Sequence, residues 1–259
     1  MLRRAMKIGL CGLGKAGKEF VKYIDDKKDI QLSAVLCRDE SDTAGKMLHD
    51  VTKFEGNFDV CIERISECKL VEKPEVIIDF SSCETTKKLV DFCAENKINL
   101  VICPTDFTPE ELELIKEKSI NSGIGIMFAP TLTLGINVMM DYLEKISKVF
   151  PTFKFEIIEK HPCNKPKPTR TAKYIADTID REEVPISSVR LDGYIGLHEV
   201  VSADGLERIT LTHETCSRQA FARGALFAAN YIKDKQGFYN INKVLRDLLI
   251  EGKAFYDED

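Results

Sequence analysis

The sequence of 259 residues contains no tryptophan, only four histidines and no C-x-x-C pair. Its nine cysteines are scattered and odd in number, which is typical of reduced thiols and argues against a disulfide framework. The histidines lack the spacing of zinc ligands, so we expect no metal site. These shortages argue against secreted disulfide scaffolds and zinc modules, and they favour a cytoplasmic protein.

A net positive charge and long apolar runs are also lacking. The net charge is −5, which argues against broad nucleic-acid or membrane-surface binding. No apolar run reaches the roughly 18 residues needed to span a bilayer. The N-terminus begins with basic residues, but its apolar part is short and rich in glycine, so it favours a strand and a turn over a signal peptide. With 44% hydrophobic residues, the chain is expected to be globular.

Apolar segments alternate with amphipathic segments through the first half of the chain. The predicted strands are Met6–Cys11, Leu32–Cys37, Val76–Phe80, Leu100–Cys103 and Ile124–Phe128. The predicted helices between them are Lys15–Ile24, Glu84–Asn96 and Pro109–Ser122. This alternation predicts an α/β domain with a Rossmann-like parallel sheet covered by helices on both faces.

The pattern changes near residue 131. The predicted strands are now Phe153–Glu159, Ser188–Asp192, His198–Ser202 and Glu207–His213, and the predicted helices are Gly135–Val149, Thr171–Ile179, Arg218–Lys233 and Ile241–Glu251. Short turns between strands indicate a mixed-sheet α+β domain. We therefore expect a dinucleotide-binding domain over residues 1–131 and a substrate-binding and oligomerisation domain over 132–236. The C-terminal segment 237–259 is expected to pack back on the first domain.

A complete G-x-G-x-x-G motif follows the first predicted strand and opens the first predicted helix. Its members are Gly12, Leu13, Gly14, Lys15, Ala16 and Gly17. Gly12 permits a tight turn, Gly14 allows the backbone to approach a pyrophosphate, and Gly17 allows close packing of helix and strand. The free N–H groups of the helix N-terminus then attract the phosphates. The motif predicts a site for a nicotinamide dinucleotide, although an ordinary glycine-rich turn remains an alternative.

The end of the second predicted strand bears on the choice between NADPH and NADH. An acid at this position binds the ribose 2′-hydroxyl in sites that prefer NADH, but here Cys37 occupies it and Arg38 follows. An arginine can pair with the 2′-phosphate of NADPH, so we favour NADPH. Asp39 could still serve as the acid, which leaves NADH open.

Residues 160–170 form a basic, proline-rich loop in an otherwise acidic chain. The prolines stiffen a segment that contains His161 and Lys165. A helix follows, with Thr169 or Thr171 as a suitable N-cap. Because cations, a possible proton donor and a helix N-terminus lie close in sequence, the loop predicts a site for a carboxylate-bearing substrate. An exposed basic loop is the alternative interpretation.

Several segments resemble one known family over nearly the full length. They are the glycine motif, Val76–Ser81, Ala129–Asn137, Glu159–Lys165, Val189–Arg190, Gly196–Val200, Glu207–His213 and Ser217–Ala225. Together they resemble the dihydrodipicolinate reductases, the nicotinamide-dependent enzymes of lysine (diaminopimelate) biosynthesis. The resemblance implies reduction of an unsaturated cyclic dicarboxylate and assembly as a homotetramer.

The resemblance also implies residue roles. His161 is the expected general acid, Lys165 is expected to bind and polarise the substrate, and Thr171 is expected to hold a carboxylate. Arg170 departs from the family pattern, but its guanidinium could hold a carboxylate through a bidentate contact. The nicotinamide is expected near a set of residues at the ends of the predicted strands. Those residues are Asp79, Phe80, Ser81, Cys103, Thr105, Ala129 and Thr131.

Two departures from the family pattern fall in the basic loop. The family has a second histidine where Pro162 stands, and Arg170 lies at or beside a family glycine. Reduction of another cyclic imino acid, or a weakly active cofactor-binding paralogue, therefore stay open as alternatives. His198 and His213 are interpreted as structural, and Cys163 as a spectator thiol.

Overall fold

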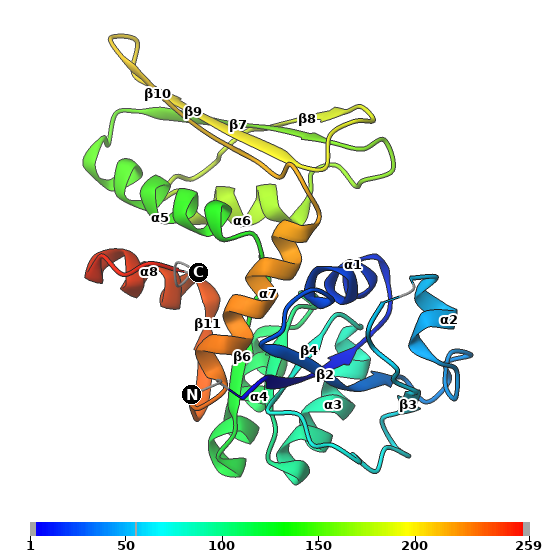
Figure 1. Ribbon diagram of the computed structural model, residues 1–259. Helices are drawn as coiled ribbons and strands as arrows, with labels where there is room; N and C mark the ends of the chain where they lie inside the picture. The colour runs from blue at the N-terminus through cyan, green and yellow to red at the C-terminus, as the bar shows by residue number, and fades with distance from the viewer. Residues whose placement is uncertain (1–3, 55, 256–259) are drawn as a thin grey trace. The chain divides into compact units, whose positions relative to one another are not determined.

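The computed structural model describes residues 4–54 and 56–255 (Figure 1). The chain divides into two compact units. The first comprises Met1–Leu132, Phe221–Val244 and Phe255–Asp259, and the second comprises Thr133–Ala220 and Leu245–Ala254. The predicted domain boundary at 131 lies one residue from the end of the first segment, Met1–Leu132. The units differ from the predicted domains further along, because residues 221–236 belong to the first unit and residues 245–254 to the second.

The first unit is built on a seven-stranded parallel sheet in the order β11-β6-β5-β4-β1-β2-β3. The strands are β1 (Met6–Cys11), β2 (Ile30–Cys37), β3 (Ile62–Arg64), β4 (Val76–Asp79), β5 (Asn99–Ile102), β6 (Gly125–Phe128) and β11 (Gly237–Asn240). The order runs outward in opposite directions from β1 and β4, so the switch point of a doubly wound sheet lies between these two strands. The predicted Rossmann-like fold is confirmed.

Helices α1 (Lys15–Ile24), α2 (Leu48–Thr52), α3 (Cys83–Asn96), α4 (Pro109–Ser122) and most of α7 (Gln219–Ile232) belong to this unit. Strands β1, β4, β5 and β6 are almost entirely buried, as expected for strands that are covered on both faces. Asn99 at the start of β5 accepts a hydrogen bond from the Gly125 amide and donates to the Ile232 carbonyl. This single side chain therefore fastens the end of α7 to the sheet.

The sequence analysis missed three short elements of this unit, namely α2, β3 and β11. Each has no more than five residues, and β11 (Gly-Phe-Tyr-Asn) has only a weak apolar pattern. Strand β11 forms because it pairs with β6 over Gly237–Asn240, a contact between segments more than 100 residues apart. Local periodicity carries no signal for such a pairing.

The second unit contains a four-stranded mixed sheet in the order β10-β9-β7-β8. Strand β7 (Lys154–His161) pairs antiparallel with β9 (Leu197–Ala203) and parallel with β8 (Ile186–Arg190), and β10 (Arg208–Glu214) pairs antiparallel with β9. Helices α5 (Leu134–Val149) and α6 (Arg170–Thr178) cover one face of this sheet. The part of α8 (Ile241–Glu251) from Leu245 onward also belongs to the second unit. The prediction of a mixed sheet is confirmed.

One strand of this sheet is displaced from its predicted position. Strand β8 begins at Ile186 and ends at Arg190, two residues before the predicted Ser188–Asp192. Every second residue of β7, including Phe155, Ile157 and Glu159, faces the helices and is buried. The inward face of β7 is apolar at Phe155 and Ile157 and becomes polar at Glu159 and His161, at the end of the strand.

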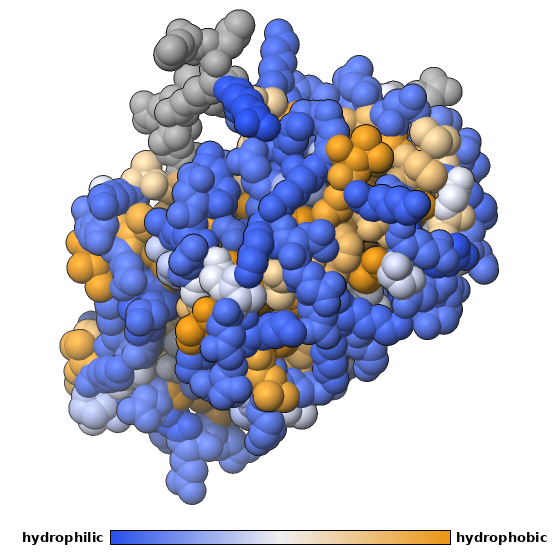
Figure 2. All heavy atoms as spheres, turned by 90° about the horizontal axis from the view of Figure 1, so that it is seen from below, coloured by the Kyte–Doolittle hydropathy of each residue, from blue (hydrophilic) through white to orange (hydrophobic). Residues whose placement is uncertain are grey.

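The face of the molecule seen in Figure 2 is largely hydrophilic, and hydrophobic residues lie there in separate groups among charged and polar side chains. Throughout the described residues, no helix combines the length and apolar character needed to cross a membrane.

Candidate active site

The glycine motif forms a tight turn between β1 and α1. Gly12 has φ +89°, and a Cβ there would lie 2.9 Å from the backbone of Phe80. A Cβ on Gly17 would lie 2.0 Å from the Gly12 carbonyl oxygen, so only glycine allows the helix to begin this close to the strand. Gly14 is the N-cap of α1 and has no side-chain cap, and a Cβ there would meet nothing within 4 Å. Open space therefore adjoins the helix N-terminus, which fits a bound phosphate group.

The carboxyl end of β4 lies beside this turn. Asp79 is fully buried, and its carboxylate accepts hydrogen bonds from the Ser81 amide at 2.8 Å and from the hydroxyls of Ser81 and Thr86 at 2.5 Å. Burial raises the pKa of Asp79 to about 6, although these hydrogen bonds act in the opposite direction. The carboxylate thus holds the loop that follows β4, and the backbone of Phe80 and Ser81 in this loop lies against Gly12.

The other residues expected near the nicotinamide follow neighbouring strands. Cys103 and Thr105 come after β5, and Ala129 and Thr131 come after β6. The Cys103 amide donates to the Asp79 carbonyl at 3.1 Å, and the Ala129 amide donates to the Ile102 carbonyl at 2.8 Å. Because all these strands are parallel, their carboxyl ends meet at the edge where a doubly wound sheet binds ligands.

Arg38 and Asp39, the two candidates at the end of β2, differ in their surroundings. Arg38 is exposed. The Asp39 carboxylate is already bound by Lys88 Nζ at 2.9 Å and by the Ser66 amide at 3.3 Å, and the hydrogen bond from Lys88 lowers its pKa. Asp39 is therefore engaged within the protein, whereas the Arg38 side chain faces solvent.

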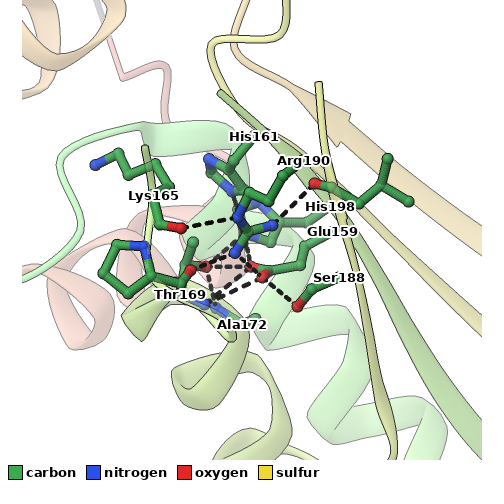
Figure 3. A network of polar contacts seen from close by, with 10 residues as sticks. Glu159, His161, Lys165, Thr169, Ala172, Ser188, Arg190 and His198 are labelled. Carbon is green, nitrogen blue, oxygen red and sulfur yellow. Dashed lines mark hydrogen bonds and ion pairs between the residues drawn. The ribbon is translucent and has the colours of Figure 1, made fainter. Parts of the chain in front are cut away.

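The second unit holds a buried polar network around Glu159 at the end of β7 (Figure 3). Its carboxylate accepts hydrogen bonds from Arg190 Nη2 and Ser188 Oγ, both at 2.6 Å. The Thr169 amide donates to it at 3.1 Å, and the Thr169 hydroxyl donates as well. Burial alone would raise the pKa of Glu159, but the hydrogen bonds from Ser188, Thr169 and Arg190 outweigh it and hold the pKa at about 2.

Arg190 connects this network to the basic loop. Its Nε donates to the Lys165 carbonyl at 3.0 Å, and its Nη2 donates to the Pro166 carbonyl. Figure 3 shows the Lys165 ammonium pointing away from Glu159. The guanidinium therefore shapes the loop through its backbone and leaves the Lys165 side chain exposed.

His161 is the last residue of β7 and is 7% exposed. Its Nε2 lies 3.3 Å from Nε2 of His198 and 3.8 Å from Glu159 Oε2. Burial lowers the pKa of His161, the Glu159 carboxylate raises it, and the cations of Arg190 and Lys165 lower it further. The structure thus turns His161 inward, and its charge depends on the groups around it.

Arg170 and Thr171 lie in the first turn of α6. Thr169 is the N-cap, and its side chain accepts a hydrogen bond from the Ala172 amide at 3.3 Å. Arg170 is exposed and Thr171 is half-buried. The first turn therefore offers backbone N–H groups and a cation next to the loop that contains Lys165.

Glu159, His161 and His198 place one ligand atom each within 4.8 Å of one another, a spacing that a metal ion could use. However, both Glu159 oxygens already accept hydrogen bonds, and the Arg190 cation lies 2.6 Å from one of them. An added cation would be repelled by Arg190 and would displace satisfied donors, so we assign no metal to this group.

Comparison with known proteins agrees with this arrangement. The family model "Dihydrodipicolinate reductase, N-terminus" matches residues 6–132, and "Dihydrodipicolinate reductase, C-terminus" matches residues 135–245. A 4-hydroxy-tetrahydrodipicolinate reductase from Clostridium tetani is 33% identical over 95% of this chain and 98% of its own length. The chain belongs to the dihydrodipicolinate reductase family.

Other dihydrodipicolinate reductases extend the similarity. A 4-hydroxy-tetrahydrodipicolinate reductase from Methanocaldococcus jannaschii is 30% identical over 93% of this chain and 97% of its own length. The solved dipicolinate-bound dihydrodipicolinate reductase from Paenisporosarcina sp. TG-14 superimposes with a TM-score of 0.77 at 24% identity, covering 93% of this chain and 99% of that chain. An amine dehydrogenase from Mycobacterium smegmatis shares the fold, with a TM-score of 0.66 at 10% identity over 92% of this chain and 95% of that chain.

Four members of the network around Glu159 were not among the predicted site residues. They are Glu159 itself, Thr169, Ser188 and Arg190. Thr169 was considered only as a helix N-cap, and a glutamate and an arginine on strands are ordinarily solvent-exposed. His198 was interpreted as structural, and the structure places it against His161. The register between β7 and β9, which sets Glu159 opposite His198, carries no local signal.

Proposed function

We propose that this chain is a 4-hydroxy-tetrahydrodipicolinate reductase of lysine (diaminopimelate) biosynthesis that uses NAD(P)H. One observation carries the proposal: the similarity to a reductase of that name spans 95% of the chain, and the two family models match residues 6–132 and 135–245, which contain the glycine turn and the loop after His161. The glycine turn would bind the dinucleotide, and the basic loop would bind the dicarboxylate.

The residues of the first unit fit a nicotinamide dinucleotide. The N-terminus of α1 and the open space at Gly14 would accept the pyrophosphate, and the carboxyl ends of β4, β5 and β6 would hold the nicotinamide. When bound, NAD(P)H supplies the hydride. We favour NADPH because Arg38 is exposed, whereas the Asp39 carboxylate is already paired with Lys88.

The second unit would bind the substrate and provide the proton. Lys165, Arg170 and the N–H groups of the first turn of α6, including that of Thr171, would hold the two carboxylates. The 4-hydroxyl of the substrate leaves as water to give the conjugated imine. The reduction then adds one hydride and one proton across this imine, and His161 would give that proton. A dianion close to Lys165 offsets cations that lower the pKa of His161, so binding of the substrate would favour the charged acid.

We further propose a cytoplasmic homotetramer assembled through the four-stranded sheet. The face of this sheet opposite α5 and α6 carries Val189, which is 42% exposed, and Leu191 after β8 is 57% exposed. All nine cysteines are free, which agrees with a reducing compartment.

The test follows NADPH absorbance with freshly prepared substrate and with a panel of other cyclic imino acids. We expect turnover with the dihydrodipicolinate-type substrate, and we expect His161→Ala to lower kcat by roughly 10²–10⁴-fold if His161 is the general acid. His49→Ala, which removes an exposed histidine of α2 in the first unit, serves as the control and should retain the wild-type rate. Turnover confined to another imino acid would reassign the substrate, and cofactor binding without oxidation across the panel would identify a binding paralogue.

A further inference from the structure

The two buried histidines of the second unit face each other through the same ring atom. Nε2 of His161 and Nε2 of His198 are 3.3 Å apart, and the rings meet edge to face at 66°. The two residues are 7% and 4% exposed, respectively. Glu159 Oε2 lies 3.8 Å from one Nε2 and 3.9 Å from the other. The pair is therefore shielded from water and shares one carboxylate.

Only one proton fits between these nitrogen atoms. If both carried hydrogen, the two N–H bonds would point at each other at hydrogen-bond distance, so one Nε2 must act as the acceptor. The Thr169 hydroxyl, 3.5 Å from His198 Nε2, donates its hydrogen to Glu159 and supplies none to the histidine pair. When His161 is charged, the hydrogen between the rings therefore lies on His161, and His198 accepts it.

Burial and the surrounding charges keep His198 in the neutral, accepting form. Burial and a charge on His161 lower the pKa of His198 to about 4, although the Glu159 carboxylate acts in the opposite direction. The charged and titratable groups that face the pair come from every neighbouring element. They are Glu159 on β7, Arg190 on β8, Lys165 in the loop and His213 on β10. The Glu159 carboxylate raises the pKa of both rings, but burial and the neighbouring cations outweigh it.

The ring of His161 is also confined from a second side. A Cβ on Gly196 would lie 2.9 Å from its Cε1 and 3.4 Å from its Nδ1. Gly196 precedes β9, the strand that carries His198, so the same segment both supports the ring and supplies its partner. A ring held on two sides keeps one orientation, which a proton donor requires.

We propose that His198 is a positioning residue that shares a single proton with His161 through their facing Nε2 atoms, and so orients the imidazole and stabilises its charged form. This inference rests on the proposed function, because it assigns the partner of the proposed general acid. It leaves Nδ1 of His161, which is buried, as the nitrogen that does not engage His198.

The first test compares His198→Leu with His198→Gln through the pH dependence of kcat/KM. A general acid loses activity as the pH rises through its pKa. Leucine removes the acceptor, so the alkaline limb should move to lower pH by about one unit. Glutamine can offer an oxygen close to the position of Nε2 and should recover at least half of that shift. A purely structural role would lower kcat in both variants and leave the limb in place.

His213→Gln is the matched control. It also removes a histidine from the inward face of the same sheet, at the position opposite His198 in the pairing of β9 with β10, but it leaves both facing Nε2 atoms in place. We expect its alkaline limb to move by much less than that of His198→Leu. An equal shift in this control would overturn the assignment, because any histidine of the sheet would then have the same effect.

A second measurement needs no turnover. Nitrogen-15 NMR of the substrate-free protein with labelled histidine reports the tautomer and the titration of each ring. We expect complementary protonation at the two facing Nε2 atoms, and we expect the His161 titration to move to lower pH in His198→Leu. Two rings that titrate independently would overturn the inference even if the enzyme is active. Paired rings in a protein that reduces no imino acid would instead contradict the proposed function alone.

Discussion

At the scale of single residues, the two buried carboxylates have opposite properties. Asp79 and Glu159 are both 0% exposed, yet the pKa of Asp79 rises to about 6 and that of Glu159 falls to about 2. Asp79 receives hydrogen bonds from neutral hydroxyls and an amide, and these do not outweigh its desolvation. Glu159 receives hydrogen bonds from Ser188 and Thr169 and, in addition, from the guanidinium of Arg190. These hydrogen bonds together outweigh burial at Glu159, whereas those at Asp79 do not.

The raised pKa of Asp79 predicts a pH dependence of stability. The folded protein keeps this proton from about pH 4 to about pH 6, whereas the unfolded chain loses it near pH 3.8. The contribution is therefore complete below pH 3.8 and is lost as the pH rises through about 6. Between pH 5 and pH 7.5 we expect it to lower the free energy of unfolding by about 1–1.5 kcal/mol.

Asp79→Asn tests this expectation by chemical denaturation at the two pH values. The variant lacks the titrating group, so the loss between pH 5 and pH 7.5 should be smaller than in the wild type by that amount. Glu159 does not interfere, because its lowered pKa confines its effect to the range below about pH 4.5, where stability falls as the pH decreases. If the free energy of unfolding had the same pH dependence in both proteins, ionisation of Asp79 would not affect stability, and the expectation would be wrong.

The choice of cofactor is also a property of single side chains. If Arg38 pairs with the 2′-phosphate, Arg38→Ala should lower kcat/KM for NADPH about 10–100-fold and leave the value for NADH nearly unchanged, because a charge-assisted bidentate pair is lost. Asp39→Asn is the control, since that carboxylate is bound to Lys88 and Ser66. If the Asp39 variant alone weakens NADH, the acid would be the ribose ligand and NADH the preferred cofactor.

At the scale of elements, two glycines of the turn from β1 to α1 have different roles, one in packing and one in leaving space for a ligand. Gly17 serves the packing of the helix on the turn, since an added Cβ would lie 2.0 Å from a carbonyl oxygen. Gly14 serves no packing contact, since an added Cβ would meet open space at φ −68°. One glycine therefore belongs to the fold, and the other is available to a ligand.

Gly14→Ala and Gly17→Ala form a matched pair. We expect Gly14→Ala to keep the free energy of unfolding within about 0.5 kcal/mol, because alanine is allowed at this φ. Its affinity for NADPH should fall at least about tenfold, since the methyl group would occupy the space of the pyrophosphate. Gly17→Ala should lower stability by about 1–3 kcal/mol through overpacking. Calorimetry measures the affinity for NADPH, and thermal denaturation measures the stability. An unchanged affinity in Gly14→Ala would show that the pyrophosphate does not bind at this turn.

Arg190 shows how one element shapes another. Its position on β8 brings a guanidinium to the Lys165 and Pro166 carbonyls, so the loop after β7 is held by a strand that follows it by more than 20 residues. Pro162 and Arg170, the two residues that differ from the family pattern, lie in this loop but do not take part in its hydrogen bonds with Arg190. These hydrogen bonds are compatible with a changed loop surface, and a change in substrate preference would arise at that surface.

At the scale of the whole molecule, the proposed tetramer predicts a native mass of four 29.3 kDa chains by light scattering. Val189→Glu should reduce that mass, because it places a charge on the sheet face proposed to be covered. Leu114→Glu, on an exposed position of α4 that is 64% exposed, should leave the mass unchanged. A monomeric wild-type protein would contradict this assembly without affecting the assignment of the fold.

The sequence by itself determined the parallel and mixed sheets, the glycine turn and the candidates His161 and Lys165, because periodicity and glycine spacing are local properties of the chain. Tertiary structure decided which side chains meet. The pairing of β11 with β6, the anchoring of the loop by Arg190 and the contact between His161 and His198 all join residues at least 24 positions apart. Such contacts depend on strand register and on the burial of charge, and both are consequences of the folded chain as a whole.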